Sequence, residues 1–132
     1  MKIAAISDIH SNVFALEAVI LDAKAQGADL LLNLGDIFYG PIAPRATYDL
    51  LMENDFVTIL GNQDRQIYEA ARAGAPGHST MQFVLNDMGQ PPLDWLKTLP
   101  FDCMLPGNIY LCHGTPKDDQ TYLLENIKSG LP

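Results

Sequence analysis

Five polar side chains that can bind metal ions follow short apolar runs of the chain: Asp8, His10, Asp36, Asn62 and His113. The carboxyl ends of parallel strands meet at one edge of an α/β sheet, so loops far apart in the sequence converge there. Carboxylate, imidazole and amide groups gathered at that edge offer oxygen and nitrogen ligands to a divalent cation. The pattern therefore predicts a metal site and, with it, the chemistry of a hydrolase.

The spacing divides these ligands into two sets that share Asp36. Asp8 and His10 are two residues apart, so in an extended segment they face the same way and can grip one ion with Asp36. A second ion would lie between Asp36, Asn62 and His113, since one carboxylate has two oxygens. Two ions about 3.5–4 Å apart can clamp a phosphoryl group and activate a hydroxide. Mixed nitrogen and oxygen ligands suit Mn, Fe, Ni or Zn better than Ca.

Each of these residues also has a simpler explanation when taken alone. Asp36 and Asn62 both adjoin a glycine, where a turn or helix-cap role is common. A single histidine such as His113 is often a hydrogen-bonded structural residue. The metal hypothesis depends on their coincidence at the ends of successive predicted strands.

Apolar runs and capping residues predict the elements that position these side chains. Strands are expected over 2–7, 30–34 and 56–60, with helices between them, which implies a parallel sheet. Helices are expected after a cap at Ser11 or Asn12 and ending at Gly27, then over 44–52, 64–72 and 79–88, and from Pro92. A hairpin with a turn at 106–108 and a last helix over 119–128 complete the α/β prediction.

The composition excludes several classes of protein. The chain has 132 residues, 48% of them hydrophobic, which predicts one domain over 1–132. The net charge is -8, so a long nucleic acid is not an expected partner. No run approaches the ~20 apolar residues of a membrane helix, and no signal peptide is evident, so a cytoplasmic location is expected. Cys103 and Cys112 lack metal-ligand spacing and are expected to be buried free thiols.

Four motifs in order carry a resemblance to a known family. Ser7-Asp8-Ile9-His10-Ser11-Asn12, Leu34-Gly35-Asp36, Leu60-Gly61-Asn62-Gln63-Asp64 and Cys112-His113-Gly114 resemble those of calcineurin-like metallophosphoesterases, especially the small bacterial phosphodiesterase-like members. The resemblance covers Lys2 to about Pro116. It implies a two-sheet β-sandwich flanked by helices and a two-metal phosphoesterase site. It assigns catalytic roles to Asp36, Asn62 and His113, with Asp64 acting from behind the ligands.

The sequence departs from that family at two points. Gln63 stands where many members carry a histidine thought to protonate the leaving group, and an amide cannot titrate. The chain also ends at Pro132 without the later histidine motif that completes both metal spheres. We therefore expect a C-terminally incomplete domain; ligands from another subunit, or weak metal binding, are alternatives. Unpaired sheet edges make a homo-oligomer possible.

Residues around the motifs are candidates for substrate binding. Arg65 and Arg45 could each hold a phosphate by a bidentate contact, Gln63 could bond a phosphate oxygen and Tyr39 could line the pocket. Surface ion pairs and core packing are the alternatives for these side chains. His78 is expected to be exposed at a loop, and the charged run over 117–119 to be a solvated loop.

The prediction that follows is a phosphoesterase that uses two divalent ions, Mn, Fe, Ni or Zn, to hydrolyse a small phosphodiester or phosphomonoester. The alternative is an interaction scaffold that keeps the phosphoesterase fold, which Gln63 and the missing distal histidines favour. A nucleotide-binding module is disfavoured because no glycine-rich phosphate loop follows the first strand.

Overall fold

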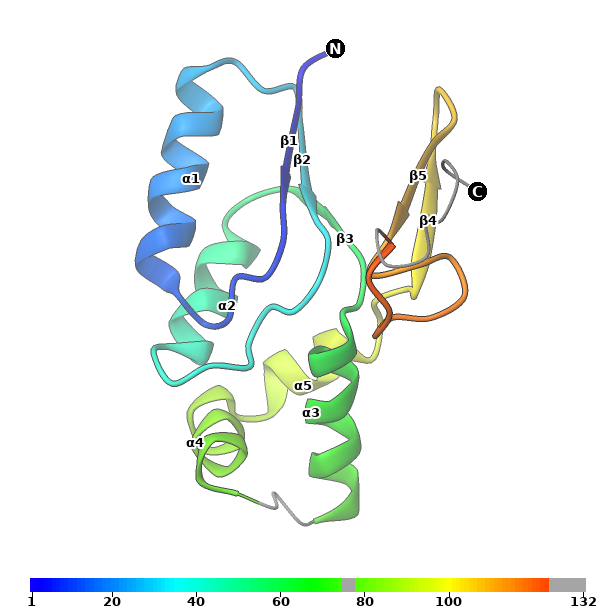
Figure 1. Cartoon of the computed structure of the whole chain (residues 1–132). Helices are drawn as coiled ribbons and strands as arrows, with labels where there is room; N and C mark the ends of the chain where they lie inside the picture. The colour runs from blue at the N-terminus through cyan, green and yellow to red at the C-terminus, as the bar shows by residue number, and fades with distance from the viewer. Residues whose placement is uncertain (75–77, 124–132) are drawn as a thin grey trace.

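The computed structural model describes residues 1–74 and 78–123, and within them the chain forms two separate sheets (Figure 1). Strands β1 (Ile3–Ile6), β2 (Leu30–Asn33) and β3 (Phe56–Thr58) form a parallel sheet in the order β1-β2-β3. Strands β4 (Asp102–Leu105) and β5 (Ile109–Cys112) form an antiparallel hairpin. The predicted parallel sheet, the hairpin and the α/β class are confirmed.

The helices follow the apolar pattern and the caps of the sequence. The described residues contain α1 (Val13–Ala25), α2 (Pro44–Met52), α3 (Asn62–Ala73), α4 (Ser79–Met88) and α5 (Gln90–Leu96). At the start of α1 the Asn12 side chain accepts a hydrogen bond from Ala15 N at 3.1 Å. Gly27 ends the same helix with a φ of 72°, a conformation that glycine adopts without steric cost. The sequence therefore fixes where α1 begins and ends.

The parallel sheet lies between helices on one face and the hairpin on the other (Figure 1). Helices α1 and α2 cover the first face, where Leu16, Ile20 and Leu51 belong to the larger hydrophobic core. On the second face Ile59 and Leu111 pack between the two sheets. Burial of apolar surface on both faces explains why β1–β3 read as continuous apolar runs. The two-sheet sandwich flanked by helices matches the predicted fold class.

Some predicted boundaries differ from the observed ones. Strand β3 ends at Thr58 rather than residue 60, α3 begins at Asn62 rather than residue 64, and α5 begins at Gln90 rather than Pro92. The helix predicted from residue 119 is wrong for residues 119–122, of which 119–121 form bends and 122 has no regular structure, and residues 124–128 lie outside the described residues. The Asp118 carboxylate accepts bonds from Gln120 N at 2.7 Å and from the Thr121 hydroxyl at 3.0 Å. Such local side-chain bonds compete with helix formation.

The hairpin register separates the two cysteines. Cys103 pairs with Leu111, and Cys112 pairs with Asp102, so the two thiols point to opposite faces of the hairpin. Both are free, as predicted, but the prediction that they are buried is wrong, since both are half-buried. Separately, none of the helices in the described residues is long and apolar enough to cross a membrane.

Candidate metal centre

The loops that follow β1 and β2 are joined by their backbones. Four backbone hydrogen bonds link them: Asp8 N to Gly35 O (2.9 Å), His10 N to Asp36 O (3.0 Å), Ser11 N to Ile37 O (2.9 Å) and Ala43 N to Ser11 O (3.1 Å). The buried Ser11 hydroxyl also accepts a bond from Ile42 N at 3.1 Å. These contacts extend the pairing of β1 with β2 beyond the ends of both strands, which fixes the metal-binding candidates of both loops relative to each other.

Asp8, His10 and Asp36 have left-handed backbone conformations, with φ of 57°, 48° and 58°. The prediction that Asp8 and His10 share one side of an extended segment is therefore wrong about the backbone. Their side chains nevertheless meet, because Asp8 Oδ1 lies 3.5 Å from His10 Nε2. Left-handed conformation costs a non-glycine residue roughly 1–2 kcal/mol. Backbone strain of this kind concentrates at functional sites, where the surrounding bonds hold it.

The Asp64 carboxylate links the loop that follows β2 to the start of α3 through hydrogen bonds. The side chain is fully buried and accepts bonds from Asp36 N (2.7 Å), Ile37 N (2.8 Å) and Gly61 N (3.0 Å). Burial raises the pKa of Asp64 to about 6, while these N–H donors oppose the rise. Asp64 does not line the cavity described below. Its position is that of a residue that orients Asp36 from behind.

Gly61 permits the close approach of the β3 loop to Asp36. A Cβ atom at residue 61 would overlap both the backbone nitrogen and the carboxylate of Asp36. The next peptide uses this closeness, because Gln63 N donates to Asp36 Oδ1 at 3.0 Å. Asp36 is therefore held by its own backbone, by Asp64 and by the first turn of α3.

Two backbone carbonyls orient the two histidines. His10 Nδ1 lies 3.0 Å from Tyr39 O, and His113 Nδ1 lies 2.7 Å from Leu34 O. A carbonyl can only accept, so each Nδ1 carries a hydrogen, and Nε2 is the ring nitrogen left to bind a metal ion. Metal-binding histidines typically donate their other ring N–H in this way.

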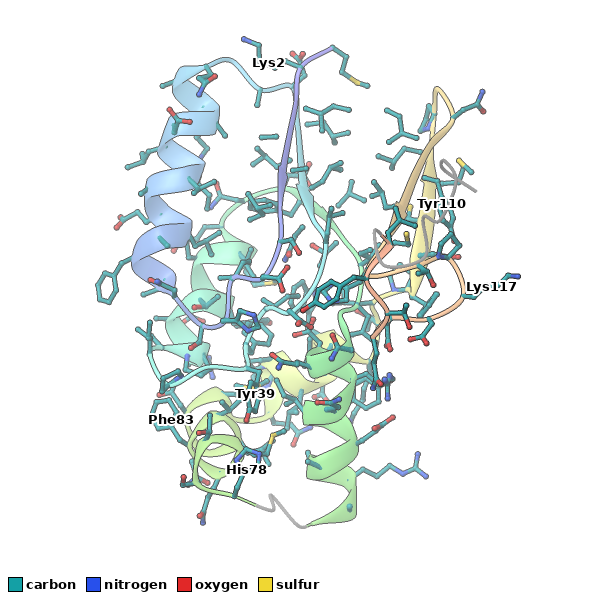
Figure 2. All side chains as sticks on the ribbon, in the orientation of Figure 1. Lys2, Tyr39, His78, Phe83, Tyr110 and Lys117 are labelled. Atoms are coloured by element: carbon teal, nitrogen blue, oxygen red, sulfur yellow. The ribbon has the colours of Figure 1, made fainter. Side chains whose placement is uncertain are left out.

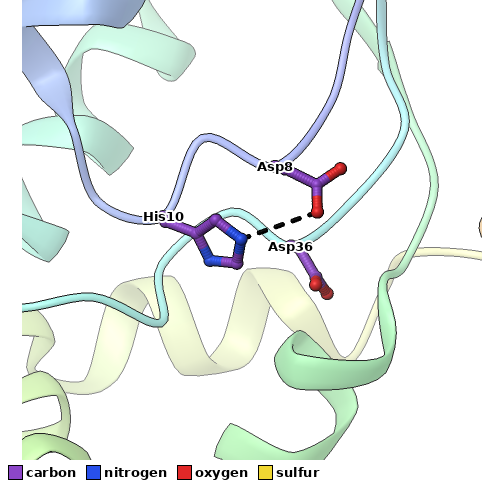
Figure 3. A group of neighbouring side chains, drawn as sticks. All are labelled: Asp8, His10 and Asp36. Carbon is purple, nitrogen blue, oxygen red and sulfur yellow. Dashed lines mark ion pairs between the residues drawn. The ribbon is translucent and has the colours of Figure 1, made fainter. Parts of the chain in front are cut away.

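The atoms that could bind metal ions form two groups, one on each side of Asp36. Donor atoms of Asp8, His10 and Asp36 all lie within 4.8 Å of one another (Figure 3). On the other side His113 Nε2 lies 3.1 Å from Asn62 Oδ1 and 3.6 Å from Asp36 Oδ1. Burial raises the pKa of Asp36, because it disfavours the charged form of the carboxylate. A divalent cation would stabilise the charged carboxylate, so the donor sets fit such an ion.

These groups open onto a cavity of about 360 Å³. Its wall combines the candidate ligands with residues from the C-terminal part of the described chain: Ser7, Asp8, His10, Leu34, Asp36, Asn62, Gln63, Cys112, His113, Gly114, Asp119, Gln120, Thr121 and Tyr122. Gln63 Oε1 is buried and has no hydrogen-bond partner among the described residues. The structure thus brings all five predicted ligands and Gln63 into one cavity.

Three of the four predicted substrate-binding residues, Tyr39, Arg45 and Arg65, do not line that cavity. The Tyr39 hydroxyl lies 3.3 Å from His78 Nε2, and Figure 2 shows both side chains beside α4. His78 is exposed, as expected, and caps α4 by accepting a bond from Met81 N at 3.3 Å. Arg45 donates to Asp49 at 3.1 Å and to Met88 O at 3.3 Å. Substrate contacts by Tyr39 and Arg45 stay predictions, and the geometry gives both residues other partners.

Arg65 and Asp119 form a contact that sequence reasoning missed. Asp119 was expected in a solvated loop, and that expectation is wrong: its side chain is 9% exposed and accepts two bonds from the Arg65 guanidinium. The carbonyls of Leu34 and Tyr39 were missed as well, because backbone atoms carry no signal in a sequence. Proximity to His113 was the available sign that Asp119 belongs to the site.

Comparison with known proteins identifies the family. The sequence profile of the calcineurin-like phosphoesterase family matches residues 1–130, so the chain belongs to this family. Uncharacterized protein MJ0912 of Methanocaldococcus jannaschii is 40% identical over 62 residues, which are 47% of this chain and 26% of that protein. The chain therefore spans a minor part of that relative.

Solved structures agree with this assignment. A metallophosphoesterase from Sphaerobacter thermophilus is 30% identical, with a TM-score of 0.72, and the match covers 92% of this chain and 51% of that one. A protein provisionally assigned as a diadenosine tetraphosphatase is 24% identical, with a TM-score of 0.69, covering 86% and 50% respectively. The second match shows the fold alone. The chain spans about half the length of both solved proteins.

Proposed function

We propose that the protein is a metal-dependent phosphoesterase that hydrolyses a small phosphodiester or phosphomonoester. The observation that carries the proposal is the orientation of His10 and His113. Each donates Nδ1–H to a backbone carbonyl, and Nε2 then faces a carboxylate, that of Asp8 for His10 and that of Asp36 for His113. Asp8, His10 and Asp36 would hold one divalent ion, and Asp36, Asn62 and His113 a second. Mn, Fe, Ni and Zn suit these nitrogen and oxygen donors.

The chain's own groups set out the rest of the chemistry. Bound divalent ions act as Lewis acids toward phosphoryl oxygens and supply a nucleophile at neutral pH. Gln63 N and the Asp64 carboxylate hold Asp36 in place, and Asp36 is the residue that both ligand sets share. The Gln63 amide lies on the cavity wall, where it can bond a substrate oxygen.

The size and charge of the protein bound the substrate. A cavity of about 360 Å³ accommodates a small ester, and the net charge of -8 disfavours a long nucleic acid. Gln63 cannot give up a proton. We therefore infer a preference for phosphoesters whose leaving group departs without protonation, such as aryl esters.

A metal-binding and turnover experiment tests the proposal. The full chain, freed of metal by chelation, is titrated with Mn²⁺ and assayed on bis(4-nitrophenyl) phosphate. Asp36→Asn is expected to weaken Mn²⁺ binding and to lower the Mn²⁺-dependent rate at least roughly 100-fold, since it removes the shared ligand. Asp94→Asn is the matched control. Asp94 lies on α5, is exposed and pairs with Lys97, the residue that follows the helix. Equal loss in both variants would contradict the assigned site.

The interaction-scaffold alternative is favoured by two observations. Each ligand set supplies three protein residues in the described chain, so water or other groups would have to fill the remaining positions around each ion, and Gln63 offers no titrating group. A chain that binds no Mn²⁺ and turns over no ester would support the scaffold and would remove the phosphoesterase proposal.

A further inference from the structure

One wall of the cavity is the segment that directly follows His113, which we call the 114–122 loop. Gly114, Asp119, Gln120, Thr121 and Tyr122 from this loop line the cavity. The loop's outer edge faces solvent, because the Lys117 side chain points away from the rest of the molecule in Figure 2. The position of this loop therefore sets the shape of the cavity beside the candidate ligand His113.

The 114–122 loop is shaped by bonds between residues close in sequence. Thr115 N donates to Asp118 O at 2.8 Å, Asp118 N donates to the Thr115 hydroxyl at 3.0 Å, and Gln120 N donates to Asp118 Oδ1 at 2.7 Å. Gly114 has a φ of 80°, and a Cβ there would lie 2.6 Å from Asp118 O. These contacts define a turn. They join residues of the 114–122 loop to one another and do not link the loop to either sheet.

Arg65 connects the loop to α3 across 54 positions of sequence. Its Nε donates to Asp119 Oδ2 at 2.9 Å and its Nη2 to Asp119 Oδ1 at 3.0 Å, a bidentate pair. The third guanidinium nitrogen, Nη1, lies 3.4 Å from Glu69 Oε1. Arg65 therefore has a carboxylate partner at every nitrogen of its guanidinium group. The side chains are 31% and 9% exposed at Arg65 and Asp119, so the contact is partly shielded from water.

We propose that Arg65 and Asp119 are a positioning pair that anchors the 114–122 loop as the wall of the cavity, and that Arg65 does not itself contact the substrate. Two facts support this assignment. Arg65 is absent from the cavity lining whereas Asp119 is part of it, and the fork of the guanidinium is already filled. A planar fork fits one carboxylate in one orientation, so the pair fixes the loop's orientation as well as its distance from α3.

Hydrogen exchange tests the anchor without relying on catalysis. In the full chain, exchange is measured by mass spectrometry for the 114–122 segment and, as an internal reference, for α1. Arg65→Gln and Asp119→Asn are each expected to speed exchange in 114–122 by roughly ten- to hundredfold, as expected for loss of a charge-assisted hydrogen-bonded pair. Exchange in α1 should stay unchanged, which shows that the variants fold. The double variant should add little to either single change, because both remove the same contact.

A matched control and a conservative variant sharpen this measurement. Arg45→Gln breaks an Arg–Asp pair within α2, away from the cavity, and should leave exchange in 114–122 unchanged. Arg65→Lys keeps the charge and loses the fork, so its exchange should lie between those of the wild type and Arg65→Gln. If both single variants leave the exchange of 114–122 unchanged, the anchor is disproved.

Phosphate affinity separates the positioning role from a substrate contact, and this arm rests on the proposed function. With Mn²⁺ present, inorganic phosphate is titrated into each variant. If the pair positions the wall, both variants should weaken phosphate binding in the same direction and raise KM for the aryl diester with little change in kcat. If Arg65 binds phosphate itself, Asp119→Asn would free it and strengthen binding, which would overturn the proposal. A wild type without phosphate binding or turnover would defeat the proposed function, and the exchange result would then decide the anchor alone.

Discussion

Different kinds of bond hold the two walls of the cavity in position. The wall that carries Asp8, His10 and Asp36 is held by backbone hydrogen bonds between two loops and by the buried Asp64. The wall formed by the 114–122 loop is held to α3 through side chains, in a contact between Arg65 and Asp119. The backbone hydrogen bonds of the first wall cannot be removed without disturbing the local fold, whereas the contact that holds the second wall can be altered one side chain at a time. Changes to the first wall should therefore cost much more stability than changes to the second.

The largest effect is expected for Gly61→Ala, which inserts a methyl group between the β3 loop and Asp36. Overpacking of this kind costs about 1–3 kcal/mol and more when backbone atoms block the space. We expect a loss near the upper end of that range in urea unfolding, together with weaker Mn²⁺ binding.

Gly27→Ala is the matched control for Gly61→Ala. Gly27 has a left-handed φ of 72° and open space around its Cβ position, so its substitution carries only the conformational cost, roughly 1–2 kcal/mol. A larger loss for Gly27→Ala than for Gly61→Ala would show that the loops after β2 and β3 are not tightly packed.

A smaller but clear loss of stability is expected for Asp64→Asn. Three backbone N–H groups point at this carboxylate, and an amide would turn its own NH₂ donor toward one or more of them. Leaving a buried donor unsatisfied costs about 1–3 kcal/mol. Urea unfolding should show this loss, while Asp49→Asn on the exposed face of α2 should stay within about 0.5 kcal/mol. Equal effects would mean that Asp64 does not fasten the wall.

The pH dependence of stability follows from the same carboxyl group. Burial raises the folded-state pKa of Asp64 to about 6, above the ordinary value of 3.8, so the folded chain binds the proton more tightly than the unfolded chain. The stability contributed by this shift is complete below pH 3.8 and is lost as the pH rises through about 6. With metal chelated, the stability difference between wild type and Asp64→Asn should therefore shrink as the pH rises across this interval. A difference that stays constant would show that the pKa is not raised.

The contrast between the walls also explains what could be predicted from the sequence. The convergence of the five candidate side chains was predictable because apolar runs locate strand ends, and parallel strands bring their carboxyl ends together. The left-handed turns at Asp8 and His10 were not, since tertiary hydrogen bonds from the β2 loop impose them. Asp119 was missed for a related reason: the charge run around it looks solvated until Arg65 is placed beside it. Bonds between distant segments leave no periodic trace in a sequence.

The smallest effect should appear when salt is varied. Ions screen a partly exposed pair such as Arg65–Asp119, and they leave backbone bonds between neutral groups nearly unaffected. Raising NaCl from low to high concentration should speed exchange in the 114–122 loop by about two- to threefold, as expected for a partly shielded ion pair. Exchange at the Asp8, His10 and Ser11 amides should stay constant, because those bonds join the β1 and β2 loops through their backbones. Arg65→Gln should abolish the salt response, since it removes the charge being screened; a response that persists in this variant would place the salt-sensitive contact elsewhere in the loop.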